Sequence, residues 1–97
     1  MDRMKLYHGI LKSKRLNSNE KMVLCLIASY EGEYLSNKFI GSELVLTPNC
    51  ISKIISRLKE WGYIETVYEE YDFTKKRMIH ITEKTIDMIK QGRNFND

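Results

Sequence analysis

The residues best suited to binding chemistry are six polar side chains between positions 48 and 61. They fall on one side of a helical pattern and comprise Asn49, Ser52, Lys53, Ser56, Arg57 and Lys59. Amides, hydroxyls and cations of this kind contact base edges and phosphates in the major groove of DNA. An ordinary amphipathic helix with a solvated polar face has the same composition. The neighbouring elements therefore have to decide between the two interpretations.

The other side of this segment carries a stripe of large apolar residues. They recur at spacings of three and four and comprise Ile51, Ile54, Ile55, Leu58 and Trp61. This spacing predicts one buried face on a helix. Thr47 can cap the helix, Pro48 fits its first position, and Gly62 can take the left-handed conformation that ends it. We therefore predict a helix over 48–61.

A shorter helix is predicted immediately before it, over 37–45. Ser36 is a candidate cap, and Leu46 and Thr47 alone would separate the two helices. In a helix-turn-helix of this kind the first helix crosses the DNA backbone and the second enters the groove. The turn lacks the glycine that such motifs often contain. The pair nevertheless favours the DNA interpretation over the ordinary helix.

Two segments rich in β-branched and aromatic residues, 63–68 and 77–82, predict strands after this motif. The polar segment 69–76 is predicted as a loop that joins them into an antiparallel wing, and Tyr34 with Leu35 can add a short third strand. Acidic residues precede the cations of the loop. We therefore expect weaker DNA contacts from the wing than from the helix.

Upstream, Asn17 and Glu20 have the spacing of a capping box and predict the start of a helix over 18–30. The first sixteen residues suggest a further helix, although Gly9 in its middle is unfavourable there. We expect that segment to be a basic arm or helix.

Downstream, Thr82 is the predicted cap of a helix over 83–91, and Gly92 its stop. Phe95 either folds back onto that helix or extends away from it. The predicted fold class is α+β, mostly α: a winged helix-turn-helix with a two- to three-stranded antiparallel wing. We expect one winged-helix domain over 1–97, with a basic arm or helix over 1–16, a core over 17–82, and a C-terminal helix and tail over 83–97.

Composition and cysteine usage indicate an ordinary soluble protein. The chain has 97 residues, of which 42% are hydrophobic and 30% charged, and it lacks both a long apolar run and a signal-peptide pattern. Cys25 and Cys50 make neither a disulfide framework nor a metal site. We therefore expect a reduced, cytoplasmic protein with no membrane partner, no metal and no cofactor.

The net charge of +3 is unevenly distributed. Six cations face two acids over 1–21, and three cations face one acid over 47–62. Phosphate neutralisation supplies most non-specific affinity for DNA. A DNA footprint is therefore expected on the N-terminal arm, where Lys12 and Lys14 lie, and on the helix over 48–61.

Four motifs within 10–82 resemble the winged-helix domains of replication initiators from Gram-positive plasmids, phages and mobile elements. They are Leu-Asn-Ser-Asn-Glu-Lys at 16–21, Ser-Asn-Lys-Phe-Ile at 36–40, Ile-Ser-Lys-Ile-Ile-Ser-Arg-Leu at 51–58 with Trp-Gly-Tyr-Ile at 61–64, and Arg-Met-Ile-His-Ile-Thr at 77–82. The chain is similar, more distantly, to MarR-type regulators and to centromere-binding proteins of plasmid partition.

The resemblance implies DNA contacts at thirteen positions. On the two motif helices these are Ser36, Asn37, Lys38, Thr47, Pro48, Asn49, Ser52, Lys53, Ser56 and Arg57, and on the wing they are Lys75, Lys76 and Arg77. Two features depart from the family pattern: Cys50-Ile51 replaces its threonine-valine, and the long C-terminal region of initiators is missing. We therefore expect either a fragment of a longer protein or a stand-alone DNA binder.

The expected function is sequence-specific binding of double-stranded DNA by a protein of a mobile element, in replication, partition or transcription regulation. A domain of this size reads few base pairs, so we expect a homodimer. Its candidate surface comprises Ile10, Leu11, Ile86, Met88 and Ile89. Replication or partition proteins are further candidate partners.

The alternative is an adaptor that binds a protein or single-stranded DNA. Tyr63, Tyr68 and Tyr71 can stack on bases or pack against a partner, although Tyr63 and Tyr68 are better explained as partial core. An enzyme is the weakest interpretation. The chain has no glycine-rich phosphate loop, paired-histidine metal helix or nucleophile elbow, and neither His8 nor His80 has a partner at local spacing.

Overall fold

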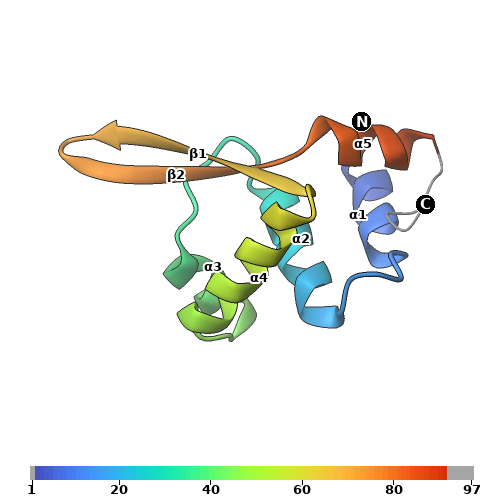
Figure 1. The fold of residues 1–97 in the computed structure, drawn as a ribbon, viewed down its shortest axis with the longest axis horizontal. Helices are drawn as coiled ribbons and strands as arrows, with labels where there is room; N and C mark the ends of the chain where they lie inside the picture. Colours follow the sequence, from blue (N-terminus) through green and yellow to red (C-terminus); the bar gives the residue numbers. More distant parts are fainter. Residues whose placement is uncertain (1, 92–97) are drawn as a thin grey trace.

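A computed structural model describes residues 2–91 and places five helices and two strands in that range (Figure 1). In chain order these are α1 (Arg3–Leu11), α2 (Ser18–Ser29), α3 (Asn37–Leu44), α4 (Pro48–Glu60), β1 (Ile64–Tyr71), β2 (Thr74–Ile81) and α5 (Glu83–Lys90). The strands project from one end of the helical body, and α1 and α5 lie at the other. This order confirms the predicted winged helix-turn-helix. The expected roles of Gly92 and Phe95 lie outside the described residues.

The predicted capping box opens α2. The backbone N–H of Glu20 donates to Asn17 Oδ1 at 2.8 Å, and the backbone N–H of Asn17 donates to Glu20 Oε1 at 2.9 Å. These two bonds satisfy backbone donors that a helix start otherwise leaves unpaired. The start of α2 is therefore fixed by local sequence.

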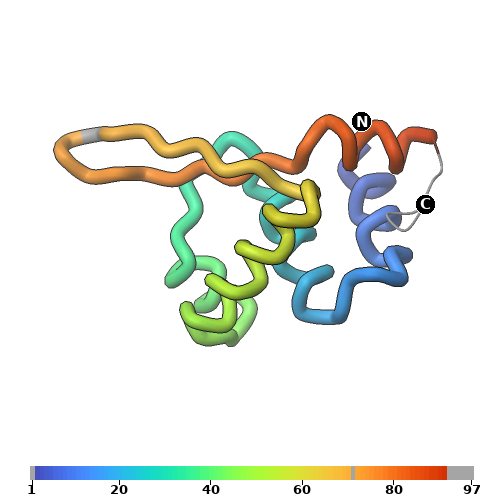
Figure 2. Tube along the Cα trace, viewed as in Figure 1, coloured from blue at the N-terminus to red at the C-terminus, as the bar shows by residue number. Residues whose placement is uncertain are grey.

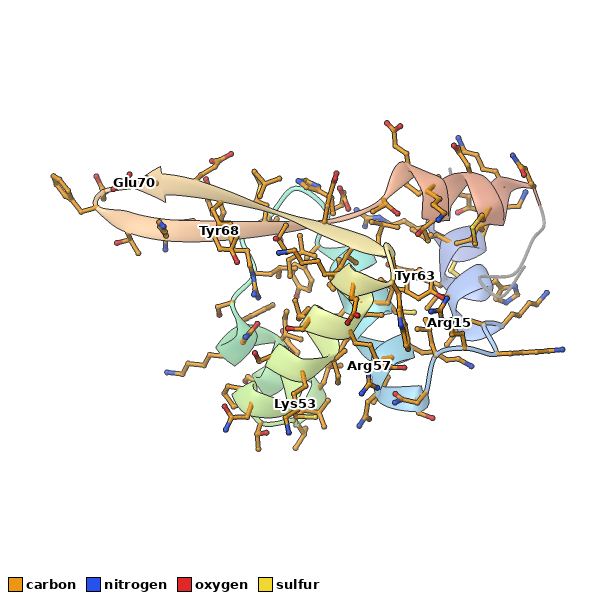
Figure 3. All side chains as sticks on the ribbon, in the orientation of Figure 1. Arg15, Lys53, Arg57, Tyr63, Tyr68 and Glu70 are labelled. Atoms are coloured by element: carbon orange, nitrogen blue, oxygen red, sulfur yellow. The ribbon has the colours of Figure 1, made fainter. Side chains whose placement is uncertain are left out.

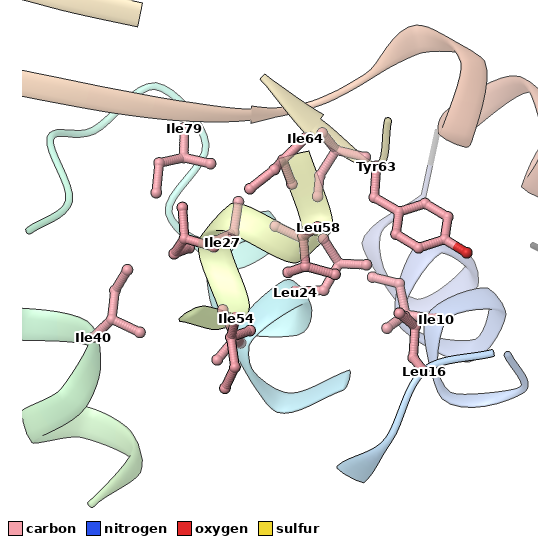
Figure 4. Packing of buried hydrophobic residues seen from close by; sticks show 14 of the residues in the cluster. Ile10, Leu16, Leu24, Ile27, Ile40, Ile54, Leu58, Tyr63, Ile64 and Ile79 are labelled. Atoms are coloured by element: carbon pink, nitrogen blue, oxygen red, sulfur yellow. The ribbon is translucent and has the colours of Figure 1, made fainter. Parts of the chain in front are cut away.

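The core lies between α2, α4 and the base of the sheet (Figure 4). The buried residues of α4 are Ile51, Ile54, Ile55 and Leu58. They pack with Leu24 and Ile27 of α2 and with Ile64 and Ile79 of the strands. Trp61, the last member of the predicted stripe, is only half-buried and caps the helix.

The turn between α3 and α4 is tight and depends on Gly41, which lies within α3. A Cβ at Gly41 would lie 2.4 Å from the backbone oxygen of Leu46, so only glycine allows this close approach. Val45 ends α3 in the left-handed conformation at φ 57°. No glycine lies between the helices. Gly41 instead permits the close approach, and Val45 takes the left-handed conformation at a cost in strain.

The wing is a longer and tighter hairpin than predicted. The strands pair antiparallel from Ile64 with Ile81 to Tyr71 with Thr74. Only Asp72 and Phe73 remain between them, both at positive φ. The predicted loop over 69–76 is therefore wrong, because most of it is strand joined by a two-residue turn. The expected third strand is reduced to one isolated bridge, between Tyr34 and Met78.

The segments at the two ends of the described chain pack on each other (Figure 2). A Cβ at Gly9 would lie 2.8 Å from Ile89 Cγ1, so the glycine lets α1 approach α5 closely. This contact buries Ile10 and Ile89 inside the chain. The expected dimer surface is therefore wrong at these two positions, whereas Leu11 remains 54% exposed.

Candidate nucleic-acid interface

The outward face of α4 carries the predicted polar ridge. Its exposed residues are Asn49, Ser52, Lys53, Ser56, Arg57 and Lys59. Thr47 and Pro48, at the start of the helix, are exposed as well. The Thr47 hydroxyl accepts from the backbone N–H of Cys50 at 3.2 Å and caps the helix. Hydroxyl, amide and ammonium groups are thus held on a fixed helix and face outward.

One member of this ridge, Arg57, is engaged within the chain. Its Nη1 donates to Oε2 of Glu20 at 2.7 Å; the arginine side chain is 50% exposed and the glutamate side chain 2%. The other carboxylate oxygen belongs to the capping box of α2. A base or phosphate that binds Arg57 therefore competes with this ion pair. The sequence indicates Glu20 only as a member of the capping box, and not as the partner of Arg57.

The predicted contacts at the start of α3 include Ser36, Asn37 and Lys38. The Ser36 hydroxyl accepts from the backbone N–H of Phe39 at 3.0 Å, and Lys38 is exposed. Asn37 Oδ1 accepts from Nη2 of Arg77 at 2.7 Å. The structure thus joins two predicted site residues from α3 and the wing.

Arg77 also donates through Nε to the carbonyl oxygen of Leu35 at 3.1 Å, while its own carbonyl accepts from the Leu35 N–H at 2.8 Å. These contacts fix the wing against the start of α3. A hollow of about 530 Å³ opens there. Its lining comprises Tyr34, Leu35, Ser36, Asn37, Phe39, Tyr68, Thr74, Lys75, Lys76 and Arg77. The structure therefore brings the predicted wing cations and the start of α3 to one surface.

Acids face the cations of the wing across the sheet. Lys76 pairs in register with Glu69. Lys75 pairs with Glu70 in the same way. Opposite charges at paired positions attract, although exposure and salt weaken the effect. These paired acids lower the net charge of the wing, in agreement with the expectation that it contributes less to DNA binding than α4.

A further cation lies beside α4, contributed by the connection between α1 and α2. The guanidinium carbon of Arg15 is 4.4 Å from the ring centroid of Trp61, and that of Arg57 is 5.8 Å from it. Burial raises the pKa of Tyr63, while the charge of Arg15 and its hydrogen bond lower it in part. The excess of cations over 1–21 indicated this connection as a basic region. No local sequence signal indicated that Arg15 lies over the ring of Trp61.

Within residues 2–91, no cluster of three or more candidate ligands is arranged to hold a metal ion. The same range contains no helix with the length and apolarity required to cross a membrane. His80 contacts Glu31, with Nδ1 2.6 Å from Oε1.

No protein-family model and no curated protein matches this chain. Its structure is similar to that of the MepR A103V mutant from a multidrug-resistant S. aureus clinical isolate, with a TM-score of 0.67 and 14% identity over 97% of this chain and 64% of that one. It is also similar to the PcaV transcriptional regulator from Streptomyces coelicolor, solved with its natural ligand, with a TM-score of 0.63 and 18% identity over 90% and 60% of the two chains.

These two similarities establish the winged-helix fold class of this chain. The chain spans less than two thirds of each of the two structures. At this identity the likeness concerns the fold alone. The resemblance to replication initiators stays a prediction.

Proposed function

We propose that this chain binds double-stranded DNA as a regulator and inserts α4 into the major groove. The observation that carries the proposal is the exposed polar ridge of α4 on a helix fixed by a buried stripe. A rigid helix with outward polar groups can place them against base edges without a cost of ordering its backbone. The start of α3 and the wing cations would contact the flanking backbone.

Within this proposal the residues divide by chemistry. Asn49 and Ser52, in the first half of α4, are suited to base edges because they both donate and accept hydrogen bonds. Lys53 is suited to a phosphate or to guanine. Arg57 can contribute to recognition only after it leaves or shares the Glu20 carboxylate. The ion pair therefore makes Arg57 a weaker candidate than Lys53.

We propose a homodimer, since two half-sites give the specificity that one such domain lacks. Because Ile10 and Ile89 are buried, a dimer surface here would use exposed residues of the same end, such as Leu11. A mobile-element setting in replication, partition or transcription regulation is proposed on the sequence motifs alone.

A second candidate function is that of an adaptor for a protein or single-stranded DNA. The observation in its favour is the exposure of Tyr68 and of Phe73, which has no shielding from the rest of the chain. Exposed aromatic side chains can stack on unpaired bases or insert into a partner. The exposed polar ridge of α4, carried on a helix that can enter a major groove, favours duplex DNA over this alternative.

Fluorescence anisotropy with a labelled mixed-sequence duplex of about 30 base pairs tests the proposal across a salt series. We expect affinity to fall steeply with salt. Lys53→Ala should make the negative slope of log K against log salt shallower by about 1. Lys90→Ala, which removes an exposed cation of α5, is the matched control and should keep the slope. Salt-independent binding, or tighter binding to the single strand than to the duplex, would favour the adaptor.

A further inference from the structure

Trp61 lies beside two guanidinium groups at the end of α4. Arg15 comes from the connection between α1 and α2, and its guanidinium carbon is 4.4 Å from the ring centroid. Arg57 comes from α4 itself, at 5.8 Å. Arginine stacks on aromatic rings through cation–π attraction and keeps its hydrogen-bond donors available at the rim. The ring therefore orients an exposed guanidinium and leaves its positive charge available to an anion.

The charge of Arg57 is partly compensated, whereas that of Arg15 is not. Glu20 pairs with Arg57 at 2.7 Å, and its two oxygens are occupied by that bond and by the capping box. Among residues 2–91, no carboxylate forms an ion pair with Arg15. The neighbouring Tyr63 hydroxyl, whose pKa the charge of Arg15 lowers in part, is a neutral group. A net positive charge therefore remains at this position.

The position of Arg15 continues the cationic side of α4. In Figure 3, Lys53, Arg57 and Arg15 follow one another from the first half of α4 to the connection before α2. Beside Arg15 lies a hollow of about 140 Å³, lined by Arg15, Trp61, Gly62, Tyr63, Lys84, Thr85 and Met88. This space leaves room beside Arg15 for an oxygen atom of a ligand.

We infer that Arg15 contacts a backbone phosphate of the DNA whose groove α4 occupies, with Trp61 as the platform that orients the guanidinium. The inference rests on the proposed function and extends its footprint beyond the helix-turn-helix and the wing. Planar guanidinium groups bind phosphate oxygens through two donors at once. Because the stacked side chain is already ordered, phosphate binding loses less conformational entropy than with a free arginine.

The test is the salt dependence of duplex binding by Arg15→Met in the full chain, with the mixed-sequence duplex as probe. Methionine keeps an unbranched side chain against Trp61 and removes the charge. We expect the negative slope of log K against log salt to become shallower by about 1. Affinity should fall by up to about tenfold near 0.1 M salt. Arg15→Lys, which keeps the charge, should retain most of the slope.

Two further variants keep the result interpretable. The loss of duplex affinity caused by Arg15→Met should be smaller in a chain that already carries Trp61→Leu, because that chain has no ring to orient the guanidinium. Lys90→Ala controls for net charge, and thermal unfolding confirms that each variant is folded. An unchanged slope in Arg15→Met, with a reduced slope in Lys53→Ala, would overturn the phosphate contact and leave the proposed function intact. Absence of duplex binding by the unmodified chain would overturn both.

Discussion

Arg57 of α4 donates at 2.7 Å to the carboxylate of Glu20, which lies in the first turn of α2 and is 2% exposed. The bond joins the proposed reading helix to the helix that packs behind it. It also satisfies an oxygen that would otherwise be buried and charged without a partner. The pair therefore helps to hold α4 in its orientation against α2.

We expect Arg57→Met to lower the free energy of unfolding by about 1–3 kcal/mol, because it leaves the Glu20 carboxylate without its cation. Urea denaturation measures the change. Lys53→Met, on the exposed face of the same helix, is the matched control and should stay within about 0.5 kcal/mol of the unmodified chain. Equal stability of the two variants would show that the ion pair has no structural role.

The two helical glycines should respond differently to alanine. At Gly41 the new Cβ would lie 2.4 Å from the backbone oxygen of Leu46, which cannot move without opening the turn. We expect Gly41→Ala to cost more than about 2 kcal/mol of unfolding free energy. At Gly9 the obstacle is the side chain of Ile89, so Gly9→Ala should cost less, and its gain in helix propensity offsets part of the loss. Thermal unfolding of both variants decides, and a milder effect at Gly41 would contradict the account.

Val45 is expected to tolerate glycine with a gain in stability. Its backbone is left-handed at φ 57° and its side chain is 90% exposed, so the residue has strain and little packing. We expect Val45→Gly to raise the free energy of unfolding by about 0.5–1 kcal/mol. Glu43→Gly, at an exposed helical position of α3, should lower it by about 1 kcal/mol. Destabilisation by both variants would argue against strain at Val45.

Stability should decline in alkali in part because of Cys25. Burial raises the pKa of its thiol above 9.0, so the folded chain keeps the proton to a higher pH than the unfolded chain. The resulting stabilisation is complete below pH 9.0 and is lost as pH rises through the folded pKa. We expect Cys25→Ala to flatten the decline of unfolding free energy as the pH rises above 9.0. An unchanged decline would assign it to other groups, such as Tyr63, whose pKa burial also raises.

Features that depend on local sequence were predictable. The cap at Thr47, the proline after it and the spacing of the isoleucines determine α4, and all of them lie within fifteen positions of one another. The capping box at Asn17 fixed the start of α2 in the same way. Such signals act through backbone hydrogen bonds and helical periodicity, which do not require knowledge of the rest of the chain.

Features that depend on distant pairs were not predictable. The partners of Arg57 and Arg77 lie 37 and 40 residues away, so the sequence could place these cations at the surface but could not identify Glu20 and Asn37. The wing turn was missed for another reason. Its positive φ angles fall on Asp72 and Phe73, whereas glycine or asparagine is the usual signal for such a turn.

The central claim, that α4 is the DNA-contacting element, is tested most directly by amide chemical-shift mapping of the labelled chain during titration with duplex DNA. We expect the largest changes at the N-terminal half of α4, including Asn49, Ser52 and Lys53, with smaller changes at the start of α3 and on the wing. Changes confined to α1 and α5, with the amides of α4 unaffected, would contradict the claim.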